Sequence, residues 1–413
     1  MDVKALKKAV AEDEDRMVAS LCDMIRINAV GPENQGPGEA KRGKFLVALA
    51  SKLGLKSTEV LESRDPSVPT GRRPNIIIRV KGGTDKNIWV VTHMDTVPEG
   101  DLRAWKYPPF EPKVVDGKIY GRGSEDNGQE LIASLYGLAA LRKAGITPEC
   151  NINLLFVSDE EHGNTYGIDF VLEKKGLFGK QDLVVVPDHG EVDGSAISVV
   201  EKSIAWINVE VVGKQTHAST PDSGINAFEV AARYLTEAVD YLRGKYSTKD
   251  PLFSPQNSTF EATRADANGP NVNTVPGRQV FAFDFRVLPD YSLDSIMSDL
   301  KRIAEKHEKK SGAKISLTFL QRADAAPRTP ADSEIVQRLS AAIEATRGSK
   351  PRSEGIGGGT CAAPFRRLGV PAVVWSTIDG TAHDANEYAV VANLVADAQV
   401  YAVLFAGNAL ERA

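Results

Sequence analysis

The sequence predicts an α/β fold interrupted by a smaller α+β domain, and three observations lead to this prediction. Near-continuous apolar strand segments alternate with helical segments in the N-terminal half, which is typical of a mainly parallel sheet covered on both faces. Near residue 200 the pattern changes to strands of alternating polarity. Segments of the first kind return after Arg322. We therefore expect one domain from residues 1–199 and 323–413, and an inserted domain from residues 200–322.

The larger domain should begin with an amphipathic helix, because apolar residues lie at helical spacing from Val18 to Ile25. Four apolar strand segments and one helix that ends at Gly145 follow. These strands are residues 75–80, 87–93, 152–159 and 182–188, the helix is residues 130–145, and a further strand at 373–378 and a last helix near 391–410 complete the domain. Functional groups are expected where such strands end.

The inserted segment shows the element order β-α-β-β-α-β. The expected elements are a strand at 203–213, a helix at 227–242, strands at 258–262 and 279–287, a helix at 293–309 and a strand at 314–320. This order is that of a compact split-βαβ sandwich.

The composition of the 413 residues excludes several classes of function. Fifty Lys and Arg against 55 Asp and Glu give a net charge of −5, so no broad basic field attracts nucleic acid or an anionic membrane. No apolar run approaches the roughly 20 residues that span a bilayer, and acidic residues occupy the N-terminal segment where a signal peptide has its apolar core. Three widely spaced cysteines make a disulfide framework implausible. We expect a cytoplasmic protein with no nucleic-acid or membrane partner.

Three candidate site residues lie at or near strand and helix ends. His93 ends an apolar strand, and Asp95 shares its face, so this carboxylate could hydrogen-bond the imidazole and fix its tautomer. A histidine at a strand end also fits a structural role. Asp126 precedes a helix in a loop with Gly121 and Gly123, where its alternative role is an N-cap.

Glu160 and Glu161 come at the end of another apolar strand. Burial of two adjacent carboxylates is costly unless a cation or a shared proton compensates. Since adjacent side chains diverge, one could bind a metal while the other faces a bound water. A solvated acidic turn is the alternative.

Asp188 and His383 also follow strands, and they complete a set of two histidines and three carboxylates. Nitrogen and oxygen ligands suit borderline divalent ions, zinc first, with cobalt or manganese as alternatives. Five ligands exceed the need of one catalytic zinc but suit two ions if one carboxylate bridges them. A thiol-rich structural site is excluded because no cysteine pair has ligand spacing.

The order and spacing of these motifs resemble the M20 metallopeptidase family over nearly the whole chain, from about Asp13 to the last helix. That family includes acetylornithine deacetylase, succinyl-diaminopimelate desuccinylase, aminoacylase, glutamate carboxypeptidase and several di- and aminopeptidases. The resemblance implies a zinc-peptidase-like catalytic domain and a small lid domain through which the chain forms a homodimer.

The resemblance also implies a role for each metal ligand. His93 and Asp188 would hold one zinc, Glu161 and His383 the other, and Asp126 would bridge both. The peptide bond after Asp126 is usually cis in the family.

The catalytic and substrate-binding residues follow from the same resemblance. Glu160 would be the general base and proton shuttle, and Asp95 would orient His93. His217 on the lid would stabilise the oxyanion, typically in the partner subunit's site. The residues expected to bind the substrate or its carboxylate are Asn273, Arg286, Arg322 and the glycine-rich loop around Gly358. That loop continues with Cys361, where the family usually has an acidic residue.

These expectations define a dinuclear zinc hydrolase that cleaves the amide bond of a small N-acyl amino acid or a dipeptide by a metal-bridging hydroxide. A strict succinyl-diaminopimelate desuccinylase or acetylornithine deacetylase is an alternative. Asp188, where the carboxypeptidase and aminoacylase branches usually have Glu, resembles the deacetylase, dipeptidase and aminopeptidase branches. A non-catalytic binding protein would have lost a ligand or the base, and neither is lost. A two-metal phosphatase or nuclease would need more cationic groups at the site.

Overall fold

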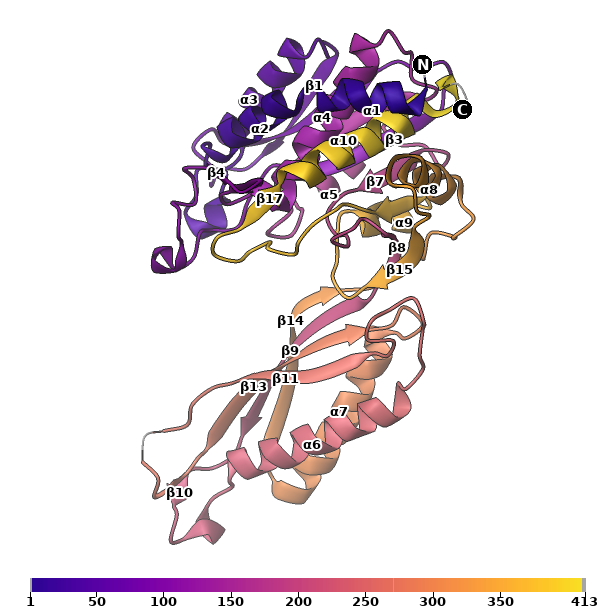
Figure 1. Cartoon of the computed structure of the whole chain (residues 1–413). Coiled ribbons are helices and arrows are strands. Elements are labelled where there is room, and N and C mark those ends of the chain that lie inside the picture. The colour runs from indigo at the N-terminus through magenta and orange to yellow at the C-terminus, as the bar shows by residue number, and fades with distance from the viewer. Residues whose placement is uncertain (1, 270, 411–413) are drawn as a thin grey trace. The chain divides into compact units, whose positions relative to one another are not determined.

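The computed structural model describes residues 2–269 and 271–410, and the chain divides into two compact units (Figure 1). The larger unit contains residues 1–199, 328–353 and 360–413, and the smaller contains residues 200–327 and 354–359. The smaller unit thus takes a few more residues after 322 than the sequence suggests, together with the glycine-rich segment. Among the described residues, no helix has both the length and the apolar character needed to cross a membrane.

The larger unit is built on an eight-stranded sheet with the order β1-β2-β6-β3-β7-β16-β8-β15. Its strands are β1 (Thr58–Arg64), β2 (Arg72–Val80), β3 (Asn87–His93), β6 (Asn151–Val157), β7 (Leu183–Val186), β8 (Ala196–Glu201), β15 (Arg352–Ile356) and β16 (Ala372–Val374). The four central strands, β6, β3, β7 and β16, run parallel, whereas β1, β2 and β8 pair antiparallel with their neighbours.

The expectation of a mainly parallel central sheet holds for the four central strands, and the flanking strands add antiparallel pairs. The connection between β1 and β2 spans only residues 65–71, and parallel neighbours need a crossover of a dozen residues or more. A short connection between adjacent strands leaves only the antiparallel arrangement, which makes the whole sheet mixed.

Helices cover both faces of this sheet, as predicted. They are α1 (Val3–Ala11), α2 (Glu14–Ile25), α3 (Ala40–Lys52), α4 (Gln129–Lys143), α5 (Ile168–Leu172), α8 (Glu334–Arg347), α9 (Ala362–Arg367) and α10 (Val391–Ala406). α4 and α10 lie side by side (Figure 1), and Gly137 permits their close approach, since a Cβ there would be 2.8 Å from the Ala398 carbonyl oxygen. α5 and α9 pack on one face of the sheet, where Phe365 and Trp89 join one apolar cluster.

A small three-stranded sheet completes the larger unit. It consists of β4 (Lys113–Val115), β5 (Lys118–Tyr120) and β17 (Tyr388–Val390), with β5 in the middle. β17 brings the segment after His383 next to the segment before Gly121. The three described cysteines are all free and buried, so no disulfide links these elements.

The smaller unit has the predicted β-α-β-β-α-β order. β9 (Ser203–Val212), α6 (Ala227–Lys245), β11 (Thr259–Ala265), β13 (Arg278–Val287), α7 (Leu293–Ser311) and β14 (Lys314–Ala323) form it. The antiparallel sheet has the order β11-β13-β9-β14. Alternate residues of β9, such as Ile207 and Val209, join the core with α6 and α7. A ribbon of β10 (Thr216–His217) and β12 (Thr274–Val275) is an addition that the sequence did not predict.

Candidate metal centre

A first group of candidate metal ligands surrounds His93, which ends the buried strand β3 and is 3% exposed. Its Nε2 atom lies 2.8 Å from Oδ1 of Asp126 and 3.4 Å from Oδ1 of Asp188. Burial alone would lower the pKa of His93, but the neighbouring carboxylates outweigh burial and raise this pKa. One imidazole nitrogen and two carboxylates thus converge where β3 and β7 end.

A second group shares Asp126 with the first. Nε2 of His383 lies 3.1 Å from Oδ2 of Asp126 and 3.1 Å from Oε2 of Glu161. Within each group the potential ligand atoms lie within 4.8 Å of one another. Burial, together with the negative charge of Asp126, raises the pKa of Glu161 to about 7. The two oxygens of Asp126 therefore face two different histidines, as a bridging ligand requires.

The donor chemistry of both groups fits divalent cations. Imidazole nitrogens and carboxylate oxygens are the ligands that zinc, cobalt and manganese accept. Oε1 of Glu161 is buried and has no hydrogen-bond partner among the described residues. An unpartnered buried carboxylate oxygen is costly, and a cation in this group would compensate it.

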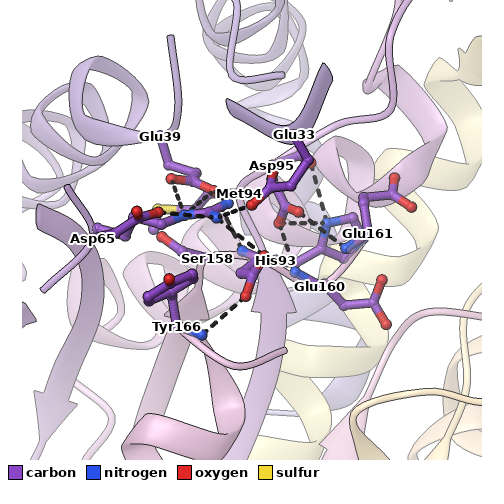
Figure 2. Close-up of polar contacts among 12 residues, drawn as sticks. Glu33, Glu39, Asp65, His93, Met94, Asp95, Ser158, Glu160, Glu161 and Tyr166 are labelled. Atoms are coloured by element: carbon purple, nitrogen blue, oxygen red, sulfur yellow. Dashed lines mark hydrogen bonds and ion pairs between the residues drawn. The ribbon is translucent and has the colours of Figure 1, made fainter. Parts of the chain in front are cut away.

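Asp95 holds the turn that carries the two glutamates. Its carboxylate accepts hydrogen bonds from the backbone N–H groups of Glu160, at 3.1 Å, and Glu161, at 3.0 Å. Nδ1 of His93 lies 3.2 Å from the backbone oxygen of Asp95 and 3.5 Å from its carboxylate. Figure 2 shows the side chains of Glu160 and Glu161 leaving the turn in different directions. Burial and the charge of Asp188 raise the pKa of Glu160 well above its ordinary value.

Arg73 supports this turn from the other side. Its fully buried guanidinium donates to Glu39, and it donates to Oδ1 of Asp159 at 3.1 Å. Glu39 and Asp65 approach the same guanidinium. Asp159 adopts a positive φ of 63°, so the residue before Glu160 has a backbone conformation that these contacts hold in place. Arg73 was not predicted as a site residue, because its strand also contains Arg72, Asn75 and Arg79 and no pattern distinguishes it.

The loop that carries Asp126 is also fixed. The Asp126–Asn127 peptide bond is cis, as the family resemblance implies. The side-chain amide of Asn127 donates to the Pro187 carbonyl oxygen at 2.5 Å and lies 3.3 Å from Oδ1 of Asp188. These bonds connect the loop of Asp126 to the loop of Asp188.

The predicted substrate residues of the smaller unit fall into two places. His217 is exposed in β10 and pairs with Thr274, next to Asn273. Arg286 lies near the Val287 end of β13. It donates two hydrogen bonds to Asp284 and one, at 2.9 Å, to the Gly357 carbonyl oxygen. The β10–β12 ribbon adjoins the Arg278 end of β13, and eight residues of strand correspond to roughly 26 Å. His217 and Asn273 are thus far from Arg286 and the loop around Gly358.

Arg322 does not join Arg286. Arg322 in β14 pairs with Ala205 of β9, whereas Arg286 in β13 pairs with Ile204 of the same strand. Because successive residues of a strand point to opposite faces, the two arginines lie on opposite faces of the sheet. Arg322 donates to Asp294 at 2.6 Å and to Asp324 at 2.7 Å. These two carboxylates pair with the positive charge of Arg322 within the smaller unit.

Cys361, which replaces the usual acid after the glycine-rich loop, is buried in the larger unit. Its thiol donates to Oδ1 of Asn164 at 3.2 Å. Burial, with the nearby charges of Glu160 and Asp188, raises the pKa of the thiol well above its ordinary value. Cys361 therefore remains a neutral thiol rather than a substitute for a carboxylate.

Comparison with known proteins agrees with this geometry. The family model for peptidase family M20/M25/M40 matches residues 89–406. The chain belongs to this family. An uncharacterised metallohydrolase of Methanococcus maripaludis is 36% identical, over 94% of this chain and 98% of its own length. A succinyl-diaminopimelate desuccinylase of Gluconacetobacter diazotrophicus is 28% identical, over 92% and 94% of the two chains.

Solved structures show the same fold. The aminopeptidase PepT of Bacillus cereus has a TM-score of 0.75 and 20% identity, with 95% of this chain and 98% of that chain covered. As a member of the M20/M25/M40 family, this protein is a metal-dependent hydrolase. The predicted family and enzyme class are confirmed.

Proposed function

We propose that the protein is a dinuclear hydrolase that cleaves an amide bond in a small N-acyl amino acid or a dipeptide. One observation carries this proposal: the two carboxylate oxygens of Asp126 face His93 in one group of ligands and His383 in the other. His93, Asp126 and Asp188 would hold one divalent ion, and Asp126, Glu161 and His383 the other, with zinc the first candidate.

When bound, the two ions supply Lewis acidity and make water a nucleophile near neutral pH. Glu160 is the proposed general base, because its side chain diverges from that of Glu161 and its environment raises its pKa. A carboxylate of raised basicity takes a proton from water and passes it to the leaving nitrogen. Asp95 keeps both His93 and the Glu160 turn in place.

The smaller unit supplies the substrate contacts in this proposal. Arg286 and the amides around Gly358 would bind a substrate carboxylate. His217 and Asn273 lie at the other end of the β13 sheet, which supports their action in the site of a partner subunit within a homodimer. His217 would stabilise the oxyanion there.

The names of the relatives set the choice of substrates to test. One curated relative is a succinyl-diaminopimelate desuccinylase, and one structural neighbour is an aminopeptidase. The panel therefore contains N-succinyl-diaminopimelate, N-acetylornithine, several N-acetyl amino acids, dipeptides and an aminopeptidase amide.

The experiment measures hydrolysis across this panel after removal of metal by a chelator and after addition of zinc, cobalt or manganese. We expect cleavage of one class that vanishes on removal and returns with metal. Phosphomonoesters serve as a control for the phosphatase alternative. Cleavage of phosphomonoesters alone, or amide hydrolysis that persists without metal, would contradict the proposal.

A further inference from the structure

Two loops of the larger unit are joined by hydrogen bonds in both directions, because each loop has a buried carboxylate that accepts backbone N–H groups of the other loop. The first loop carries Asp126, and its backbone N–H groups donate to Glu387 of the second loop. Gly123 donates to Oε2 of Glu387, and Glu125 and Asp126 donate to Oε1, each at 3.0 Å. Arg122 also donates to Oε2, at 2.7 Å, so the charge of Glu387 is paired.

The second loop carries His383. The carboxylate of Glu125 in the first loop accepts hydrogen bonds from backbone N–H groups of this second loop. Asp379 donates to Oε1 of Glu125 at 2.6 Å, and Ala382 donates to Oε2 at 3.1 Å. Thr381 donates to Oε2 through its backbone N–H at 2.5 Å and through its hydroxyl at 2.9 Å. Glu125 is 3% exposed and Glu387 is fully buried.

We infer that Glu125 and Glu387 are positioning residues that fix the separation between Asp126 and His383. Each carboxylate fixes the backbone beside a proposed ligand on the other loop, and hydrogen bonds from N–H groups to a buried carboxylate are among the stronger ones in proteins. The pair therefore holds the two loops at the distance that the shared Asp126 needs. The inference rests on the ligand assignment of the proposed function.

The two groups of ligands respond differently to loss of this clamp. His383 belongs only to the group with Asp126 and Glu161. The amides that Glu125 holds lie one to four residues before His383, so loss of Glu125 loosens His383. The group of His93, Asp126 and Asp188 keeps its own contacts, including the bond from Asn127 to the Pro187 carbonyl.

The test is a titration of the chelator-stripped full-length protein with Co²⁺, followed by calorimetry and by visible absorption. In Glu125→Gln, an amide NH₂ replaces one oxygen that accepts N–H groups. We expect one of the two ions to bind about 10–100-fold more weakly, as is typical when the partner of a ligand is changed, while the other keeps its affinity. Thr381→Val removes the hydroxyl hydrogen bond to Glu125, together with two hydrogen bonds to the backbone of Tyr388, and should weaken the same ion by a smaller factor.

Asp182→Asn is the matched control. Asp182 is a buried carboxylate that accepts from Trp89 and Gly179 before β7, at the opposite end of that strand from Asp188. This variant should bind both ions as the unmodified protein does. The inference would be overturned if Glu125→Gln and Thr381→Val bound both ions as tightly as the unmodified protein does. It would also be overturned if Asp182→Asn lost as much affinity as Glu125→Gln. If the unmodified protein binds fewer than two ions, the proposed function itself fails. If Glu125→Gln does not fold, Thr381→Val decides the question.

Discussion

Glu160 and Glu161 are neighbours in sequence but have different surroundings. Glu161 faces His383 at 3.1 Å, whereas the carboxylate of Glu160 is influenced most, after burial, by the charge of Asp188. The proposed roles of Glu161 as a ligand and Glu160 as a base need this difference, because a ligand must give its oxygen to a cation and a base must remain available for a proton.

The first prediction concerns these two residues. Glu160→Ala should lower turnover by about 10²–10⁴-fold while both ions stay bound, because only the proton acceptor is lost. Metal content by atomic absorption and the rate on the substrate found in the panel measure the two effects. Glu161→Ala is the comparison variant and should lose one ion. Turnover close to normal in Glu160→Ala would reject the role of this residue.

Four of the five candidate ligands could be grouped from the sequence because each follows an apolar strand, and the carboxyl ends of parallel strands meet at one edge. The fifth, Asp126, lies in the loop before α4. Arg73, Glu125 and Glu387 could not be found in this way, because their roles depend on contacts with residues up to 265 positions away. A buried carboxylate that accepts backbone amides has no distinctive spacing in sequence. The cis bond after Asp126 was reached through family resemblance alone.

At the scale of elements, β9, β13 and the two helices of the smaller unit were predicted within a few residues, because their alternating and helical patterns are long. The antiparallel flank of the larger sheet and the β10–β12 ribbon were not predicted. Strand direction depends on connection length and neighbour choice, and the two-residue strands of the ribbon are too short for a pattern.

The second prediction tests the core of the smaller unit. Phe285 in β13 is fully buried, with ring centroids 5.0 Å from Phe260 and 4.9 Å from Phe283. Phe285→Ala should lower the free energy of unfolding by about 3–5 kcal/mol, because it removes apolar contacts and leaves a cavity. Urea unfolding measures the loss. Phe228→Ala on α6, where the side chain is 54% exposed, is the control and should change it by less than about 0.5 kcal/mol.

The third prediction concerns the ion pair that connects the segment before β6 to α8. Glu149 accepts from Arg338 at 2.8 Å and 3.1 Å, and this pair lowers the pKa of Glu149 to about 2. Because the pKa is lower in the folded state, the contribution to stability is complete above the unfolded pKa near 4.5. It is lost as the pH falls from about 4.5 towards 2.

Glu149→Gln should therefore reduce the free energy of unfolding by about 1–2 kcal/mol at pH 6, a value discounted for partial exposure to solvent. The difference between the two proteins should shrink below pH 4.5. Urea unfolding at pH 6, 4.5 and 3 measures it. A difference that is constant over this range would mean that Glu149 acts through packing rather than charge.

At the scale of the whole molecule, sequence patterns located the insertion but not the return of residues 354–359 to the smaller unit. A six-residue glycine-rich segment has no periodicity, and its membership depends on contacts such as that between Arg286 and Gly357. The segment places Gly358 in the same unit as Arg286.

The fourth prediction tests the homodimer. If His217 acts in the partner subunit's site, His217→Ala and Glu160→Ala dimers are each inactive, but a mixed dimer has one complete site. Random exchange of equal amounts should restore roughly a quarter of the normal activity. Activity is measured after mild dissociation and reassociation of the mixture. Mixing without dissociation is the control, and failure to recover activity after exchange would show that His217 serves its own chain.

The position of β16 has a consequence for how this protein is made on the ribosome. β16 lies between β7 and β8 in the sheet, yet residues 372–374 are synthesised long after either neighbour. The smaller unit, apart from residues 354–359, is complete at residue 327 and can fold first, because domains fold as units during synthesis. By then the growing chain already has His93, Asp126, Glu161 and Asp188, but His383 has not yet been added. Four of the five proposed ligands therefore exist before β16 completes the sheet that supports them, and His383 is added only after β16 has been synthesised.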